Sequence, residues 1–248
     1  MTPLEQHQHE IEQNLQAWQK KPLLQKIYAD FYRRILGLID PRQAGAIVEI
    51  GSGIGNLKGH LPQAWSTDLF PNPWLDLVCD GYEMPFRNRT LSHLVLFDVF
   101  HHLRAPRAFL GEAKRVLAPD GKLILFEPYI SWASYPAYGW FHHEPVALGK
   151  NISPADRLPR PRDYYAAQGN ATRLFFRNDN PEILNGWRTV HAERFAAFSY
   201  LLSGGYSKPA LYPEAWIDRL QGMDARLSMW PKIFGARCLV VLRPQVAT

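Results

Sequence analysis

Short apolar runs alternate with polar, turn-forming segments through the central part of the chain. The runs have the length and the β-branched or large apolar character of buried strands, and they fall at residues 47–50, 65–67, 75–79, 91–97 and 122–126. Apolar residues at helical spacing, as in 109–117, lie between them, and Pro119-Asp120-Gly121 predicts a turn. Strands that alternate with helices predict an α/β fold with a doubly wound parallel sheet.

The flanking segments follow other patterns. Residues 23–36 have apolar side chains at helical spacing, which predicts a helix packed on the sheet. Residues 189–202 read as strand, 212–227 as helix and 238–242 as a last strand. The stretch between 129 and 188 is rich in aromatic residues and proline, and so long a connection is usually functional or has helices of its own.

Three glycines at alternate positions, Gly51, Gly53 and Gly55, follow the first predicted strand. Glycine permits positive φ and lets a ligand approach the main chain closely. The dinucleotide-binding fingerprint would need glycine where this chain has Asn56, which argues against a nicotinamide oxidoreductase. No Gly-Lys-Ser/Thr sequence follows to cradle a nucleoside triphosphate. The loop therefore predicts a different ligand.

Acidic residues stand at or just after the ends of the predicted strands, namely Glu49, Asp68, Asp80 and Asp98. The carboxyl ends of parallel strands meet at one edge of a sheet, where ligands of such folds bind. Asp68 has the spacing of a carboxylate that accepts hydrogen bonds from ribose hydroxyls. It could equally cap the turn before Pro71.

Together these motifs resemble those of class I S-adenosylmethionine-dependent methyltransferases, in order and at the expected spacing over residues 46–128. The matching features are acidic-x-Gly-x-Gly-x-Gly from Glu49, the Asp80 to Phe86 segment, Asp98 followed by His101-His102-Leu103, and Arg115 to Lys122. Met84 stands where leucine is usual.

The resemblance implies a Rossmann-like seven-stranded sheet with an antiparallel last strand. One methyltransferase domain would span residues 1–248: an N-terminal helical lid (1–40), a cofactor-binding core (41–130), an acceptor-side insertion after strand five (131–188) and the C-terminal part of the sheet (189–248). Trp18, Tyr28 and Tyr32 would contribute to a lid over the cofactor.

The resemblance also implies the cofactor, S-adenosyl-L-methionine, and its site. Glu49 would lie near the methionine end, Asp68 at the ribose hydroxyls and Asp80 at the adenine amine. The full expected set is Glu49, Gly51, Ser52, Gly53, Asn56, Asp68, Leu69, Asp80, Gly81, Asp98, Val99 and Tyr28.

Two histidine doublets are candidates for a proton acceptor, since histidine titrates near neutral pH. His143, with Glu144 as its orienting partner, lies in the insertion where acceptor chemistry is chosen; the alternative is a surface doublet before Pro145. His101 lies just after strand four, but we interpret this doublet as mainly structural, shaping the turn on the cofactor side, so His143 is the first choice. The histidines lack the i, i+4 spacing of a helical metal site, so no metal is expected.

Composition limits the partners. The formal charge of +5 and pI near 9.2 raise the possibility of nucleic acid, but the basic residues are dispersed and no RNA-binding signature accompanies them. The aromatic residues of the insertion would suit an aromatic or other flat, apolar acceptor, and Arg157, Arg160 and Arg162 could meet an acidic or carrier-protein-linked one. No apolar run reaches the length of a membrane span, and the polar N-terminus with only two cysteines predicts a cytoplasmic protein.

The sequence therefore predicts a methyltransferase for a small-molecule acceptor, with O-methylation favoured over C- or N-methylation. The alternative from a different class is a cofactor-binding regulatory subunit without catalysis.

Overall fold

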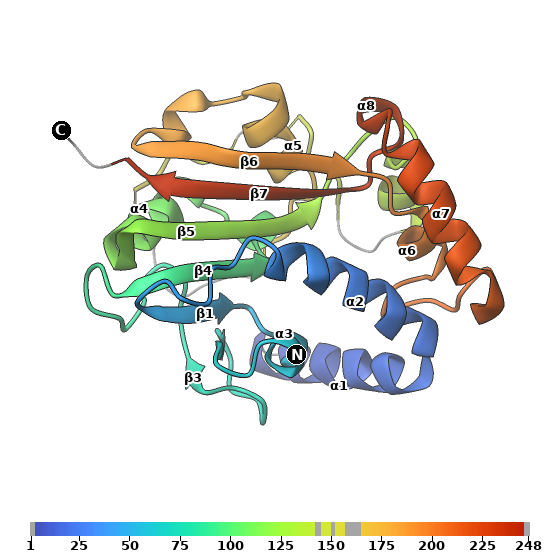
Figure 1. Cartoon of the computed structure of the whole chain (residues 1–248), viewed down its shortest axis with the longest axis horizontal. Helices are drawn as coiled ribbons and strands as arrows, with labels where there is room; N and C mark the ends of the chain where they lie inside the picture. Colours follow the sequence, from blue (N-terminus) through green and yellow to red (C-terminus); the bar gives the residue numbers. More distant parts are fainter. Residues whose placement is uncertain (1–2, 142–144, 150–151, 157–164, 246–248) are drawn as a thin grey trace.

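Seven strands form one mixed sheet in the order β3-β2-β1-β4-β5-β7-β6, in a computed structural model that describes residues 3–141, 145–149, 152–156 and 165–245 (Figure 1). Strands β1 to β5 pair in parallel, while β7 runs antiparallel to both β5 and β6. The bounds are β1 Ala46–Ile50, β2 Trp65–Asp68, β3 Leu77–Val78, β4 Leu91–Phe97, β5 Leu117–Pro128, β6 Trp187–Phe195 and β7 Arg237–Pro244. The predicted Rossmann-like sheet with an antiparallel last strand is confirmed.

Helices cover both faces of this sheet (Figure 1). The α-helices are α1 Pro3–Lys20, α2 Pro22–Leu36, α3 Asn56–His60, α4 Pro106–Val116, α5 Asn170–Thr172, α6 Phe198–Leu202, α7 Ile217–Leu227 and α8 Pro231–Phe234. Short 3-10 or π turns are η1 Phe100–His102, η2 Ala137–Phe141, η3 Arg173–Arg177, η4 Pro181–Leu184 and η5 Glu214–Trp216.

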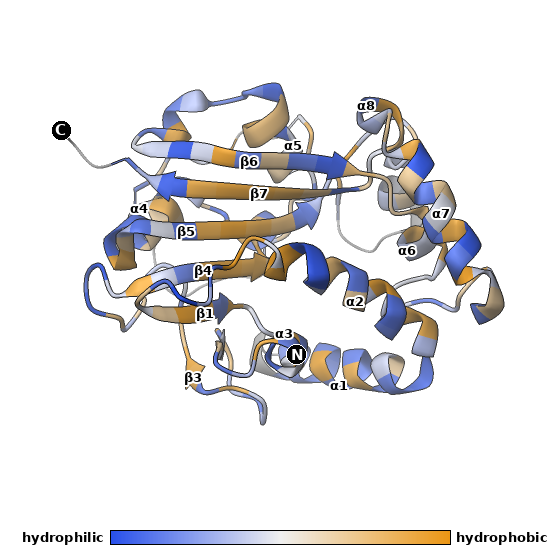
Figure 2. Ribbon diagram, viewed as in Figure 1, coloured by the Kyte–Doolittle hydropathy of each residue, from blue (hydrophilic) through white to orange (hydrophobic). Residues whose placement is uncertain are grey.

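Alternation along the central strands builds two cores. In β4, Val95 and Phe97 face the cluster formed with α2, whereas Leu94 and Leu96 face the cluster formed with α4. Strands buried on both faces carry few polar residues, and the second half of β4 and the middle parts of β5 and β7 are accordingly hydrophobic (Figure 2). The two cores thus hold the sheet from both faces, and functional side chains can lie at the carboxyl ends of its parallel strands.

Two predicted boundaries differ from the structure. Residues 119–121 lie inside β5, in an irregular stretch where pairing with β4 shifts between Leu91 and His93. The predicted turn therefore lies within the bounds of β5, where an advance of two residues along β4 is paired with an advance of five residues along β5. Residues 198–202 form α6 rather than strand, because β6 ends at Phe195 and the chain then turns to cover the α2 face.

The two N-terminal helices have different surroundings. Helix α2 buries Leu24, Ile27 and Ile35 against the sheet, as its apolar spacing predicts. Helix α1 lies beside the glycine loop: the Cδ1 atom of Ile11 is 3.9 Å from where a Cβ on Gly53 would lie. In the described ranges of the chain, no helix has both the length and the apolar character needed to cross a bilayer.

Candidate active site

The glycine loop that follows β1 has the backbone conformation that the sequence predicts. Gly51, Gly53 and Gly55 all have positive φ, at 72°, 53° and 73°. A Cβ on Gly51 would lie only 2.4 Å from the Cγ2 atom of Val99, so a larger residue would require Val99 or the loop to shift. Ser52 ties the loop to β2, because its backbone N–H donates to the Thr67 carbonyl and its Oγ accepts from the Thr67 N–H.

Glu49 lies under this loop with 3% of its surface exposed. Burial raises the pKa of its carboxyl group to about 8, although a hydrogen bond with Ser52 opposes the shift. Its Oε2 atom is buried without a hydrogen-bond partner among the described residues. An unpartnered buried carboxylate oxygen is costly, and a ligand that brings a positively charged donor would satisfy it.

Asp68 ends β2 at the rim of the same loop. Its Oδ2 accepts from the Gly53 N–H at 3.0 Å, and its Oδ1 accepts from the Leu69 N–H at 2.7 Å. The Nε2 of His7 in α1 lies 4.0 Å from Oδ1. Asp68 therefore orders the loop and also faces the N-terminal helix, so the turn-forming and ligand-binding interpretations are compatible.

Asp80 follows β3 and begins the next turn. Its Oδ1 accepts from the Tyr82 N–H at 2.9 Å. Beside it, a Cβ on Gly81 would contact Phe109 at 3.4 Å and Ile50 at 3.5 Å. The small residue lets this turn lie close to the end of β1, and it places Asp80 along the same carboxyl edge as Glu49 and Asp68.

An ion pair between buried Arg237 and partly exposed Asp98 joins the end of β4 to the start of β7 at that edge. Asp98 has φ of 57° and accepts from Arg237 at 2.5 Å, and Arg237 is only 1% exposed. The guanidinium carbon lies 4.9 Å from the ring centroid of Tyr200 and 5.0 Å from that of Phe126. Burial opposes the charge of Arg237, but Asp98 raises the pKa of this guanidinium well above its usual value.

The second central feature is the buried pair of His101 and Glu127. The Oε2 of Glu127 lies 2.7 Å from Nδ1 of His101. Glu127 also accepts from the backbone N–H groups of Val99 at 2.9 Å, Phe100 at 2.7 Å and His101 at 3.3 Å. The carboxylate thereby fixes the turn after β4 and favours the imidazole tautomer with its proton on Nδ1.

Asp98, His101 and Glu127 bring ligand-type atoms within 4.8 Å of one another. A cation there would compete with the four N–H groups that already donate to Glu127, and Arg237 holds Oδ2 of Asp98. The donor set suits a hydrogen-bonded network better than a metal ion.

The remaining residues that the sequence predicts for the site contact parts of the chain other than the glycine loop, or lie outside the described residues. The Asn56 amide donates to the Tyr206 hydroxyl at 3.2 Å. The buried Tyr28 ring stacks on Phe97, with centroids 5.2 Å apart. His143 and Glu144 lie outside the described residues. The structure thus brings Glu49, Gly51, Ser52, Gly53 and Asp68 together, and joins Val99 to them through Gly51.

Sequence reasoning missed Glu127 and Arg237. Glu127 ends an apolar strand, and the rule that selected Asp68 and Asp98 could have found it. Arg237 stands before an apolar strand without any motif, and only the antiparallel pairing of β5 with β7 brings it to Asp98.

Comparisons with known proteins concern the family and the fold. Residues 48–125 match the family model described as a methyltransferase domain. A sequence search of curated proteins found no significant match.

Solved structures share the fold at low sequence identity. One is the putative methyltransferase in complex with the Trm112 methyltransferase activator from Haloferax volcanii (17% identity, 87% of this chain and 88% of that chain covered, TM-score 0.51). Another is the YcgJ protein from Bacillus subtilis (10% identity, 88% and 98% covered, TM-score 0.50).

The residues fit the cofactor that the family model implies. Glu49 offers an unpartnered buried oxygen, the glycine loop is shaped by positive φ, and Asp68 and Asp80 follow along the same edge. Residues 48–125 therefore form a methyltransferase domain, which implies S-adenosylmethionine as its cofactor, and the chain shares its fold with these solved structures.

Proposed function

We propose that this methyltransferase acts on an oxygen atom of a small-molecule acceptor, and that His101 accepts the proton of that group. The observation that carries the proposal is the buried 2.7 Å contact between Glu127 and Nδ1 of His101 at the carboxyl ends of β4 and β5. A carboxylate that holds the proton on Nδ1 leaves Nε2 with the lone pair of a base.

S-adenosylmethionine supplies an already activated methyl group on a positively charged sulfur. The chain has to hold the acceptor in line and remove a proton from a hydroxyl group. Glu127 orients the imidazole of His101 and stabilises its charged form when it takes up the proton. Its three backbone donors keep the carboxylate in place during that transfer.

His143, oriented by Glu144, is the second candidate for the base. It belongs to the insertion after β5, which supplies acceptor-side residues in this proposal. Substitution of each histidine in turn separates the two assignments.

The test is methyl transfer from isotopically labelled S-adenosylmethionine to a panel of hydroxyl, carboxyl, amine and carbon acceptors. With the acceptor that emerges, His101→Asn should lower turnover about a hundredfold near pH 7, as general-base loss typically does. Calorimetry should show nearly unchanged cofactor affinity. His191→Asn, on the outer strand β6, is the matched control.

Several results would contradict parts of the proposal. Turnover within a few-fold of the parent in His101→Asn, with a large loss in His143→Ala, would transfer the role to His143. A methylated nitrogen or carbon product would remove the oxygen assignment. Cofactor binding without transfer to any acceptor would favour a regulatory subunit.

A further inference from the structure

A cavity of about 310 Å³ opens just beyond the end of β5. Its size is at the lower end of the range for small-molecule sites, about 300–1,000 Å³. The residues that line it come from the insertion, from η3 and from α8, and they are Tyr129, Ile130, Ser131, Trp132, Tyr135, Leu148, Arg177 and Lys232.

This cavity is connected to the proposed base by short stretches of backbone. Tyr129 is two residues beyond Glu127, about 7 Å along an extended chain. The Ile130 N–H donates to Thr172, and the Ala167 N–H donates to the His101 carbonyl, so the segment 167–172 joins the cavity wall to the turn of His101. A ligand in the cavity would therefore be adjacent to the carboxyl edge of the sheet.

The charge of the lining is positive and unbalanced. Arg177 and Lys232 are exposed, and neither forms an ion pair or side-chain hydrogen bond with any other residue that the structure describes. The lining contains no acidic residue within these described segments. Two cations at one cavity favour an anionic ligand, and arginine suits carboxylate and phosphate geometry.

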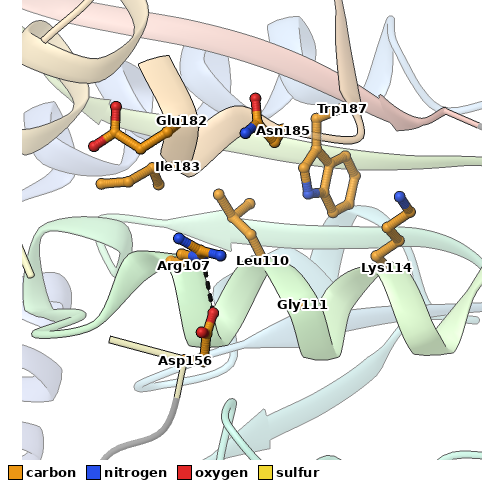
Figure 3. A pocket seen from close by; sticks show the side chains of 9 residues that line it. All are labelled: Arg107, Leu110, Gly111, Lys114, Asp156, Glu182, Ile183, Asn185 and Trp187. Carbon is orange, nitrogen blue, oxygen red and sulfur yellow. Dashed lines mark ion pairs between the residues drawn. The ribbon is translucent and has the colours of Figure 1, made fainter. Parts of the chain in front are cut away.

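A second cavity has a lining in which positive and negative side chains are equal in number. It measures about 150 Å³ and lies between α4 and the start of β6 (Figure 3). There Arg107 pairs with Asp156 at 2.7 Å, and the lining also contains Lys114 and Glu182, which lie at opposite ends of the pocket (Figure 3). Its charges are balanced by the chain itself, so it offers an anion no comparable attraction.

The walls beside the two cations are aromatic and open to solvent. Trp132 is 86% exposed and Tyr135 is 46% exposed, whereas large apolar side chains are usually covered in a folded chain. Aromatic rings at the lip of a cavity provide flat surfaces on which an apolar or aromatic group can stack. Cations and exposed rings thus meet around one opening.

We propose that this cavity is the acceptor site and that it takes a small molecule with a flat apolar part and a carboxylate or phosphate group. The inference rests on the proposed function, whose methyl acceptor it specifies. Arg177 and Lys232 hold the anionic group, and Trp132 and Tyr135 cover the apolar part.

The test is binding of phenyl phosphate and of benzoate to the full chain, measured by ligand-observed NMR titration with saturating S-adenosylhomocysteine. Benzyl alcohol serves as the neutral probe of similar size. The double variant Arg177→Gln, Lys232→Gln should weaken binding of the preferred anion about tenfold and leave the neutral probe unchanged. Arg188→Gln, an exposed arginine on β6, should have no effect.

Comparison of the affinities for phenyl phosphate and benzoate shows which acid group the cavity prefers. Trp132→Ala should weaken binding of both the preferred anion and the neutral probe several-fold. Equal anion affinity in the parent and the double variant overturns the inference. A second result would also overturn it: the chain sediments with anionic vesicles, Trp132→Ala abolishes this sedimentation, and neither anion binds. The exposed surface would then be a membrane contact.

The outcome is separable from the proposed function. If His101→Asn leaves turnover intact while the double variant loses the anion, the base assignment fails and the cavity assignment stands. If labelled methyl transfer goes to an acceptor whose KM is unchanged in the double variant, the cavity assignment fails and methyl transfer stands.

Discussion

Two regions at the carboxyl edge of the sheet are built in different ways. The glycine-loop region, residues 49–68, is nearly continuous in sequence, and its geometry comes from backbone conformation and two acidic side chains. The central cluster of Asp98, His101, Glu127 and Arg237 comes from the ends of three strands and depends on contacts between side chains. The geometry expected to bind the cofactor is therefore encoded locally, whereas the side-chain cluster that we propose for proton transfer exists only once the sheet has formed.

One contact joins the two regions. Val99, whose N–H donates to Glu127, lies against Gly51, where a Cβ would come within 2.4 Å of its Cγ2. A change in either region should reach the other through this contact.

The largest effect is expected from Arg237→Met. Removal of one partner from a buried ion pair leaves the other charge uncompensated, which typically costs about 3–5 kcal/mol. Asp98 would be that charge, so the free energy of unfolding, measured by denaturant titration, should fall by this amount. The double variant Arg237→Met, Asp98→Asn should recover much of the loss, and Arg188→Met on β6 should change little. A loss below about 1 kcal/mol in the single variant would show that the cluster does not depend on this pair.

Gly51→Ala tests the contact between the regions. The positive φ of 72° costs a non-glycine residue about 1–2 kcal/mol, and the overlap with Val99 adds a similar amount. We expect a loss of about 2–4 kcal/mol in unfolding free energy together with weaker binding of S-adenosylmethionine. Gly59→Ala in α3 is the control, because a Cβ there would meet no atom within 4 Å. Equal stability of the two variants would mean that the loop moves away from Val99 at little cost.

The same contrast explains which features could be predicted from the sequence. The strands β1 and β4 and the loop after β1 carry their apolar and glycine patterns within a few consecutive residues, so their positions follow from local preference. Helix α6 was predicted as strand, because its apolar residues suit either state and the α2 face decides between them. Arg237 could not be predicted, since its role depends on a pairing partner more than a hundred residues away in sequence.

Asp68→Ala tests whether the glycine-loop region binds the cofactor on its own. Loss of a hydrogen bond to a charged group costs about 1.5–3 kcal/mol, which predicts roughly ten- to a hundredfold weaker binding of S-adenosylmethionine by calorimetry. Asp68 also accepts from Gly53 and Leu69, so thermal unfolding should be measured alongside. Asp120→Ala, in an exposed part of β5, is the control. Unchanged affinity would remove Asp68 from the site.

A different kind of prediction concerns the dependence of stability on pH that Glu49 confers. Burial raises its pKa to about 8, so the ligand-free folded chain keeps a proton there that the unfolded chain loses above its ordinary value of 4.5. The folded form binds more protons within that window, and this contribution to stability is therefore lost as pH rises from about 4.5 to 8. Glu49→Gln should remove this contribution, so that the free energy of unfolding, measured by denaturant titration, falls less between pH 4.5 and pH 8.

Cofactor binding should show the opposite dependence on pH. A positively charged donor beside Glu49 favours the ionised carboxylate, so affinity for S-adenosylmethionine should rise between pH 6 and pH 7, by at most about tenfold per unit. Calorimetry at the two pH values in buffers of different ionisation enthalpy should also detect release of a proton on binding. Glu49→Gln should bind more weakly and lose both the slope and the proton release. An identical slope in the variant would assign the titration to another group and would leave Glu49 with a purely structural role under the glycine loop.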